Sequence, residues 1–213
     1  MDPLSSLLGR LASLPSYWKP SLAQLSSKCE KEGRTLSLRA LLFAMRDMPY
    51  GRPVGDINGA RECITQWRGT CSAKHFAAYE LLDTLGLSPK LWLACYQLDL
   101  TKTYYSDEIR ARAESRQIYD VHNYLTCELN GSIKIIDITF PSSLGIYGLP
   151  VTESWTGKED FVLCCDPEER RHVGRIKDAD RVKRDWLRSL NSREALGLRE
   201  QAIHELMHVA KRS

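Results

Sequence analysis

Three residues of this chain have side chains that could together perform nucleophilic chemistry: Cys71, His122 and Asp137. A thiolate is a strong nucleophile, and an imidazole can take up its proton. A carboxylate can orient the imidazole and stabilise its cation. Such a set functions only where the three side chains meet, so the elements that carry them decide whether the chemistry is possible.

Cys71 is expected at the start of a helix. Residues 76–85 read as helical, and Gly86 suits the position just after a helix. Gly69 and Thr70 precede Cys71, which therefore falls in or next to the first turn. The partial positive charge and unpaired N–H groups there favour thiolate over thiol, and these groups, with the Cys71 amide, could bind an oxyanion. The buried stripe of this helix is predicted to comprise Ala78, Leu81, Leu82 and Leu85.

His122 and Asp137 fall on two runs rich in β-forming residues, 121–129 and 132–140, joined by Asn130-Gly131. This dipeptide strongly indicates a two-residue hairpin, because both loop residues must adopt positive φ. The resulting register places Tyr124 opposite Asp137. A preceding buried strand is expected at residues 91–96.

This register makes His122 and Asp137 diagonal neighbours on one face of the sheet, with their backbones about 7–8 Å apart. Asp137 could then accept the Nδ1 proton of His122 and leave Nε2 for the thiol. Thr139 is expected on the same face, opposite His122. One inserted bulge residue would move Asp137 to the other face, so the proposed set depends on register.

These segments resemble the transglutaminase-like superfamily over roughly residues 40–141. The resemblance rests on Gly69-Thr70-Cys71 and the helix ending at Leu85-Gly86-Leu87, then His122-Asn123-Tyr124, Leu129-Asn130-Gly131 and Ile136-Asp137-Ile138-Thr139-Phe140. It implies an α+β, papain-like core with a nucleophile helix packed on an antiparallel sheet, and acyl transfer through a thioester. It also implies catalytic roles for Cys71, His122 and Asp137.

Two features of the family bear on individual positions. Ile138 stands where proline is common in the family's strand motif. Members often have an aromatic residue upstream of the cysteine that helps to hold the oxyanion. Tyr50 matches this position best, with Gln66 and Trp67 as alternatives.

The chain is expected to form one domain over residues 1–213, with a core at about 35–165 and a helical extension at 166–213. A helix is predicted at 35–48, loops at 49–60 and 142–157, a last strand at 161–165, and one or two helices at 178–211. Residues 104–118 are expected to form a mobile loop or short helix at the rim of the site. The basic stretch 170–188 contains interleaved acidic residues, which favours a solvated helix face.

The 213 residues are 43% hydrophobic and 27% charged, with a formal net charge of +3, which is typical of a globular protein without strong attraction for nucleic acid. No apolar run approaches the ~20 residues of a membrane span, and no signal peptide is visible at the start. We therefore expect a cytoplasmic protein with reduced thiols, six of the seven cysteines being structural. No cofactor or metal is expected.

Two alternatives to the thiol enzyme stay open. His204-Glu205-Leu206-Met207-His208 is a literal H-E-x-x-H, which on a helix would present two imidazoles for zinc with a glutamate as base. No third ligand is identifiable. The other alternative is a binding module that keeps the fold without the chemistry. The favoured interpretation is an enzyme acting on an amide or ester, by hydrolysis or by transfer to an amine.

Overall fold

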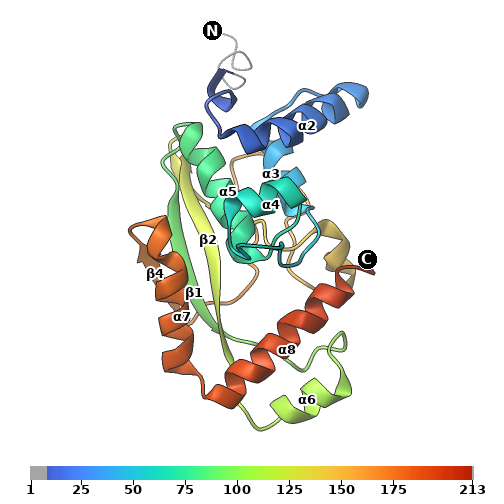
Figure 1. Ribbon diagram of the computed structural model, residues 1–213, viewed down its shortest axis with the longest axis vertical. Helices are drawn as coiled ribbons and strands as arrows, with labels where there is room; N and C mark the ends of the chain where they lie inside the picture. The colour runs from blue at the N-terminus through green and yellow to red at the C-terminus, as the bar shows by residue number, and fades with distance from the viewer. Residues whose placement is uncertain (1–8, 213) are drawn as a thin grey trace.

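Four antiparallel strands form the sheet of this α+β protein, in the order β3-β2-β1-β4 (Figure 1). The computed structural model describes residues 9–212. The strands are β1 (Lys90–Gln97), β2 (Tyr119–Leu129), β3 (Ser132–Ile136) and β4 (Glu169–Val173). The central strands are β2, which carries His122, and β1, which precedes it in the chain.

The hairpin of β2 and β3 has the predicted two-residue loop and register. Asn130 and Gly131 have φ values of 53° and 76°, as this loop requires. Leu129 pairs with Ser132 and Leu125 with Ile136, without a bulge between them. The ladder ends at Ile136, so the residues from Asp137 to Phe140, expected to extend the strand, continue as irregular chain.

Helices precede, separate and follow these strands in the described part of the chain. They are η1 (Ser16–Trp18), α2 (Lys19–Lys31), α3 (Leu38–Arg46), α4 (Ala60–Gln66), α5 (Cys71–Thr84), α6 (Asp107–Ala113), η2 (Ser142–Tyr147), η3 (Ile176–Asp178), α7 (Ala179–Leu190) and α8 (Arg193–Val209). The predicted helices at 35–48 and 178–211 are thus confirmed, the latter as two helices. The 104–118 segment contains the short helix α6.

The main core lies where α5 and α7 both pack on β2. It contains side chains with almost no exposed surface, namely Ala77, Ala78, Leu81 and Leu82 of α5, Leu91 and Leu93 of β1, and Val121 and Leu125 of β2. Burying one such leucine or valine contributes roughly 1.5–3 kcal/mol. The predicted apolar stripe of α5 is therefore what fixes this helix against the sheet.

Residues 161–165 do not form the predicted last strand. One backbone hydrogen bond, from Phe161 N to Ile135 O at 2.9 Å, links this segment to β3. Side chains occupy the neighbouring donors: Asp160 accepts from Ile135 N at 2.8 Å, and Thr152 accepts from Val162 N at 2.7 Å. A ladder cannot propagate where its N–H groups are already bonded.

The last strand is instead β4, which pairs with β1 on the edge of the sheet. Its sequence, Glu-Arg-Arg-His-Val, is exposed except at Val173. Charged side chains suit an edge strand but weaken the sequence signal. The segment 166–213 therefore contains a strand as well as helices, which corrects the expectation of a purely helical extension.

Two further expectations concern the chain as a whole. Within residues 9–212, no helix has the length and apolar character needed to cross a membrane. All seven cysteines are free.

The hairpin loop offers a direct test of its backbone geometry. Gly131→Ala is expected to lower the free energy of unfolding by about 1–2 kcal/mol, because an L-residue is strained at positive φ, although open space surrounds the position. Gly197→Ala is the matched control: it is exposed in α8 with equal space, and we expect a gain of up to about 1 kcal/mol from helix propensity. Urea unfolding measures both. If both substitutions changed the free energy of unfolding by the same amount, the positive φ of Gly131 would be contradicted.

Candidate active site

The structure brings Cys71, His122 and Asp137 together. Cys71 is the first residue of α5, after Thr70 in extended conformation, and is partly exposed. His122 is buried on β2, and Asp137 is buried one residue beyond β3. His122 Nε2 lies 2.9 Å from Asp137 Oδ2, and Cys71 is near enough to the imidazole to raise its pKa. The spatial order is therefore thiol, imidazole, carboxylate.

The ring nitrogens of His122 have the reverse of the predicted roles. Nε2, not Nδ1, contacts the carboxylate. Because Asp137 is an ionised acceptor, Nε2 carries the proton and donates it. The prediction assumed a regular strand pair up to residue 139, whereas the ladder ends at Ile136 and residues 137–139 have no regular secondary structure. Asp137 thereby approaches the far side of the ring, and Nδ1 is the nitrogen left for the thiol.

Every oxygen of the Asp137 carboxylate is engaged. Oδ1 accepts from Thr139 N at 3.1 Å and Thr139 Oγ1 at 2.6 Å, and Oδ2 accepts from His122 and from Cys164 N at 2.8 Å. Burial raises the pKa of Asp137, but the charge and hydrogen bond of His122 outweigh burial, and the net pKa lies well below its usual range. The carboxylate therefore stays charged and fixed.

This charge also acts on His122. Burial lowers the pKa of His122, whereas the charge and hydrogen bond of Asp137, then the contact with Cys71, raise it well above the ordinary value. An imidazolium is thus stabilised between a carboxylate and a sulfur atom. A thiolate–imidazolium pair is the reactive form of a cysteine nucleophile.

A second histidine, His75, supports the site from one turn into α5. It is fully buried, with Nδ1 2.7 Å from Cys71 O, and its Nε2 accepts from Ile138 N at 3.1 Å. These partners require a proton on Nδ1 and none on Nε2, so the ring is neutral. Burial agrees with this state, lowering the pKa of His75 to about 4. His75 therefore links the nucleophile turn to the chain beside Asp137.

Lys74 forms a second buried link. Its ammonium donates to three backbone carbonyls: Arg46 at 2.6 Å, Met48 at 2.9 Å and Thr139 at 3.1 Å. Burial lowers its pKa to about 7. Lys74 thus joins α5 to the end of α3 and to Thr139, which hydrogen-bonds Asp137. Sequence reasoning missed both Lys74 and His75, although two polar residues in a buried helix were a readable signal.

Tyr50 lies beside the start of α5. A short parallel bridge pairs Tyr50 with Gly69, with Gly69 N donating to Pro49 O at 3.2 Å. Gly69 also leaves room for two buried side chains, since a Cβ there would lie 2.9 Å from both Cys63 Sγ and Lys74 Cγ. Burial, and then the charge of Cys71, raise the pKa of Tyr50 well above its ordinary value. Its hydroxyl is therefore a neutral donor.

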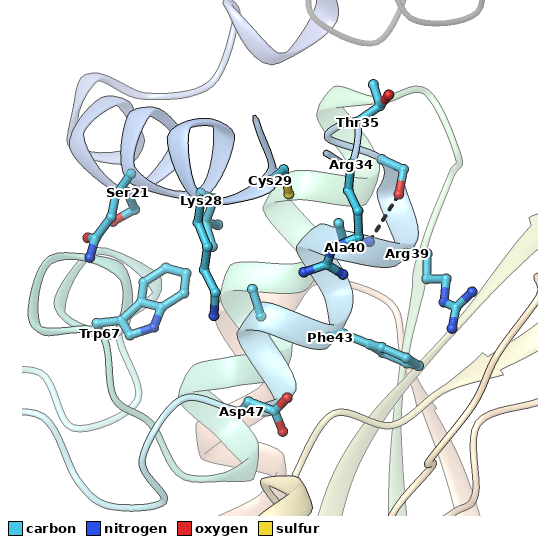
Figure 2. A pocket seen from close by; sticks show the side chains of 14 residues that line it. Ser21, Lys28, Cys29, Arg34, Thr35, Arg39, Ala40, Phe43, Asp47 and Trp67 are labelled. Carbon is cyan, nitrogen blue, oxygen red and sulfur yellow. Dashed lines mark hydrogen bonds between the residues drawn. The ribbon is translucent and has the colours of Figure 1, made fainter. Parts of the chain in front are cut away.

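The other two oxyanion candidates point elsewhere. The exposed Gln66 side chain bonds the backbone N and O of Val54, each at 2.8 Å. Trp67 ends α4 in a left-handed conformation and lines a separate cavity of about 600 Å³ with side chains from α2 and α3 (Figure 2). That cavity does not include Cys71. Tyr50 is therefore the candidate that the fold brings to the cysteine.

Lys183 of α7 is a site residue that the sequence did not indicate. Its ammonium lies 3.6 Å from Cys71 Sγ, 3.2 Å from Ser72 Oγ and 2.8 Å from Asn123 Oδ1. Ser72 also donates to Asn123 at 3.0 Å. The basic stretch interpreted as a solvated helix face thus turns at least one cation toward the cysteine.

The surroundings of Cys71 favour its thiolate. Burial raises the pKa of the thiol, but the charge of Lys183 and then the hydrogen bond and charge of His122 lower it to about 6. Cys63, Cys95 and Cys127 show the opposite behaviour, since burial raises their pKa to about 11 or 12. Its charged partners therefore distinguish Cys71 from these three buried thiols, whereas the lowered pKa of Cys165 comes first from its hydrogen bond with Cys164.

Two cavities meet at the cysteine. One of about 550 Å³ lies toward α7 and α8, and one of about 360 Å³ lies toward Tyr104, Tyr105 and Cys164. Tyr50 and Cys71 line both. A group bound in either cavity would thus reach the same sulfur atom. The 104–118 segment and the loop after residue 147 contribute to the second cavity, as expected for a rim.

The H-E-x-x-H segment lies on α8 with the predicted spacing. His204 and His208 are exposed, with ring centroids 4.5 Å apart. Glu205 is occupied, accepting from Ser106 N at 2.7 Å at the start of α6. Between residues 9 and 212, one group of three histidine, cysteine or acidic side chains has ligand atoms within 4.8 Å of one another: His122, Asp137 and Cys164. No third zinc ligand accompanies His204 and His208 in that part of the chain.

Comparisons with protein-family models, with curated proteins and with solved structures find no match to this chain. The site is therefore interpreted from its own geometry.

Proposed function

We propose that this protein is a cysteine-dependent acyl-transfer enzyme with a papain-like, transglutaminase-like core. The observation that carries the proposal is the position of Cys71 at a helix start, between His122 backed by Asp137 and the Lys183 ammonium. The lowered thiol pKa and the two cavities at the sulfur support it. The substrate class is an amide or ester.

In the first half-reaction, the Cys71 thiolate attacks the carbonyl carbon, and the carbonyl π electrons move to oxygen. His122, protonated at Nδ1, gives this proton to the leaving amine or alcohol as the tetrahedral intermediate collapses to a thioester. In the second, a water or amine attacks the thioester while His122 takes its proton. The carbon–sulfur bond then breaks and restores the thiolate.

The oxyanion needs donors that are in place before the reaction. The Cys71 amide is suited to this, because the first N–H groups of a helix have no intrahelical acceptor. The Tyr50 hydroxyl, neutral because of its raised pKa, can supply a second hydrogen bond from its place beside both cavities. Asp137 keeps His122 in one orientation and tautomer and stabilises its cation.

The test is the rate of alkylation of each cysteine by iodoacetamide as a function of pH, read by peptide mass spectrometry. We expect Cys71 to react fast at pH 7, with a midpoint near pH 6 as its pKa requires. His122→Ala should move this midpoint upward by removing the stabilising cation. Cys71→Ala should abolish turnover of activated esters and leave the fold unchanged by circular dichroism.

An ordinary midpoint near pH ~8.5 in the wild-type protein would show that the thiolate is not stabilised and would overturn the proposal. Full esterase activity in Cys71→Ala would do the same. Activity abolished by a chelator but retained in Cys71→Ala would favour metal chemistry at another site. A reactive Cys71 with no turnover of any acyl substrate would indicate a binding module.

A further inference from the structure

The cavity of about 550 Å³ beside Cys71 has an uneven charge. Five basic and three acidic side chains line it, and most of them already have partners. Arg199 pairs with Asp120 and Glu200, and Arg52 also pairs with Glu200. Asp120 and Glu200 are therefore already paired with Arg199 and Arg52, and their charges do not neutralise the remaining cations.

The two cations left over are Arg184 and Arg188, one turn apart on α7. Both are exposed and line the cavity. Within residues 9–212, neither forms a hydrogen bond or an ion pair. Arg184 acts on Asp180 only through space, and the Asp180 carboxylate accepts from Asn58 Nδ2 at 3.2 Å. Among the described residues, two guanidinium groups thus line the cavity without a protein acceptor.

The two arginines lie on the same helix, α7, as the lysine beside the Cys71 sulfur atom. Lys183, the neighbour of Arg184, lies 3.6 Å from Cys71 Sγ and is bonded to Ser72 and Asn123. A molecule whose carbonyl lies at the sulfur atom can therefore extend along α7 toward Arg184 and Arg188. Guanidinium groups match the planar geometry of a carboxylate through paired N–H donors.

We propose that this cavity selects an acyl group bearing a carboxylate, which Arg184 and Arg188 bind while its carbonyl carbon meets Cys71. The inference rests on the proposed function and specifies its substrate class. The other cavity, lined by Tyr104, Tyr105 and Cys164, has no comparable basic pair and is left for the leaving group or acceptor.

The test uses two alkylating reagents that differ in charge. Iodoacetate is an anion and iodoacetamide is neutral, and both alkylate the same sulfur atom. The ratio of their rates at Cys71 thus reports the local field independently of intrinsic thiol reactivity. We expect Arg184→Gln/Arg188→Gln to lower this ratio about three- to fivefold at low salt, and added salt to lower the wild-type ratio.

Arg181→Gln is the matched control, since Arg181 lies on the same helix, pairs with Asp178 and does not line the cavity. The ratio for this variant should equal the wild-type ratio. A ratio unchanged in the double variant, or lowered equally in Arg181→Gln, would overturn the inference alone. A Cys71 that resists both reagents would overturn the proposed function as well.

Turnover provides a second readout. The p-nitrophenyl monoester of adipic acid and the p-nitrophenyl ester of hexanoic acid have acyl chains of equal length, and only the first carries a carboxylate. After subtraction of the Cys71→Ala rate, kcat/KM should favour the adipate ester in the wild-type enzyme, with the preference reduced at least threefold in the double variant. Equal preference in the two proteins would contradict selection by the arginines.

Discussion

Replacing Lys183 by methionine is expected to slow alkylation of Cys71 at pH 6 about tenfold. The ammonium lies 3.6 Å from the sulfur atom, and it is the strongest influence that lowers the thiol pKa. Loss of one opposite charge at this distance should raise the pKa by about one to two pH units. The pH profile of iodoacetamide alkylation measures the change, and the wild-type and variant rates should converge near pH 9.

Two further variants make this result specific. Lys183→Arg retains the charge and should keep the midpoint within about half a pH unit of the wild-type value. Lys177→Met removes an exposed lysine just before the same helix and should leave the profile unchanged. If the alkylation profile of Lys183→Met matched the wild-type profile, His122 alone would account for stabilisation of the thiolate.

Replacing Asp137 by asparagine is expected to lower the free energy of unfolding by about 3 kcal/mol near pH 5.5. The carboxylate accepts four hydrogen bonds in a buried site, whereas an amide has one acceptor and adds two donors. His122 also loses its stabilising partner. Urea unfolding of the two proteins measures the difference.

The pH dependence of this difference follows from both partners. Asp137 has a lowered pKa in the folded state, so its stabilisation is present above the unfolded value of about 3.9 and is lost as pH falls. His122 has a raised pKa, so its stabilisation is present below about 6.5 and is lost as pH rises through the folded value. The difference should therefore be largest between about pH 5 and 6.5 and smaller at pH 3.

The exposed Asp185 of α7 provides the control, and Asp185→Asn should change stability by less than about 0.5 kcal/mol. A constant deficit of Asp137→Asn from pH 3 to pH 8 would indicate a packing defect instead of a lost ion pair.

The sequence predicted those parts of the site that local rules determine. Asn130-Gly131 requires one loop geometry, and this loop sets the register that brings Asp137 toward His122. The apolar stripe of α5 likewise identifies the face that packs on β2. Because these are short-range relations, the three residues of the proposed catalytic set could be chosen without knowledge of the tertiary structure.

The parts that were missed depend on contacts between distant segments. Lys183 is one of many basic residues in its stretch, and only the path of the chain through β4 and η3 brings it to Cys71. The irregular conformation of residues 161–165 depends on Asp160 and Thr152, whose side chains accept from Ile135 N and Val162 N, and no pattern in that segment reveals these contacts. The ring nitrogen of His122 that contacts Asp137 depends on where the β2–β3 ladder ends, at Ile136.

The separation of Lys183 from Cys71, 112 residues along the chain, has a consequence for synthesis. At about 5–20 residues per second, the lysine leaves the ribosome on the order of ten seconds after the cysteine. Helix α5 can form during this interval, while its thiol still lacks the ammonium group that ionises it. The nascent chain is therefore expected to carry a less reactive sulfur atom, and the full lowering of the thiol pKa waits until α7 docks.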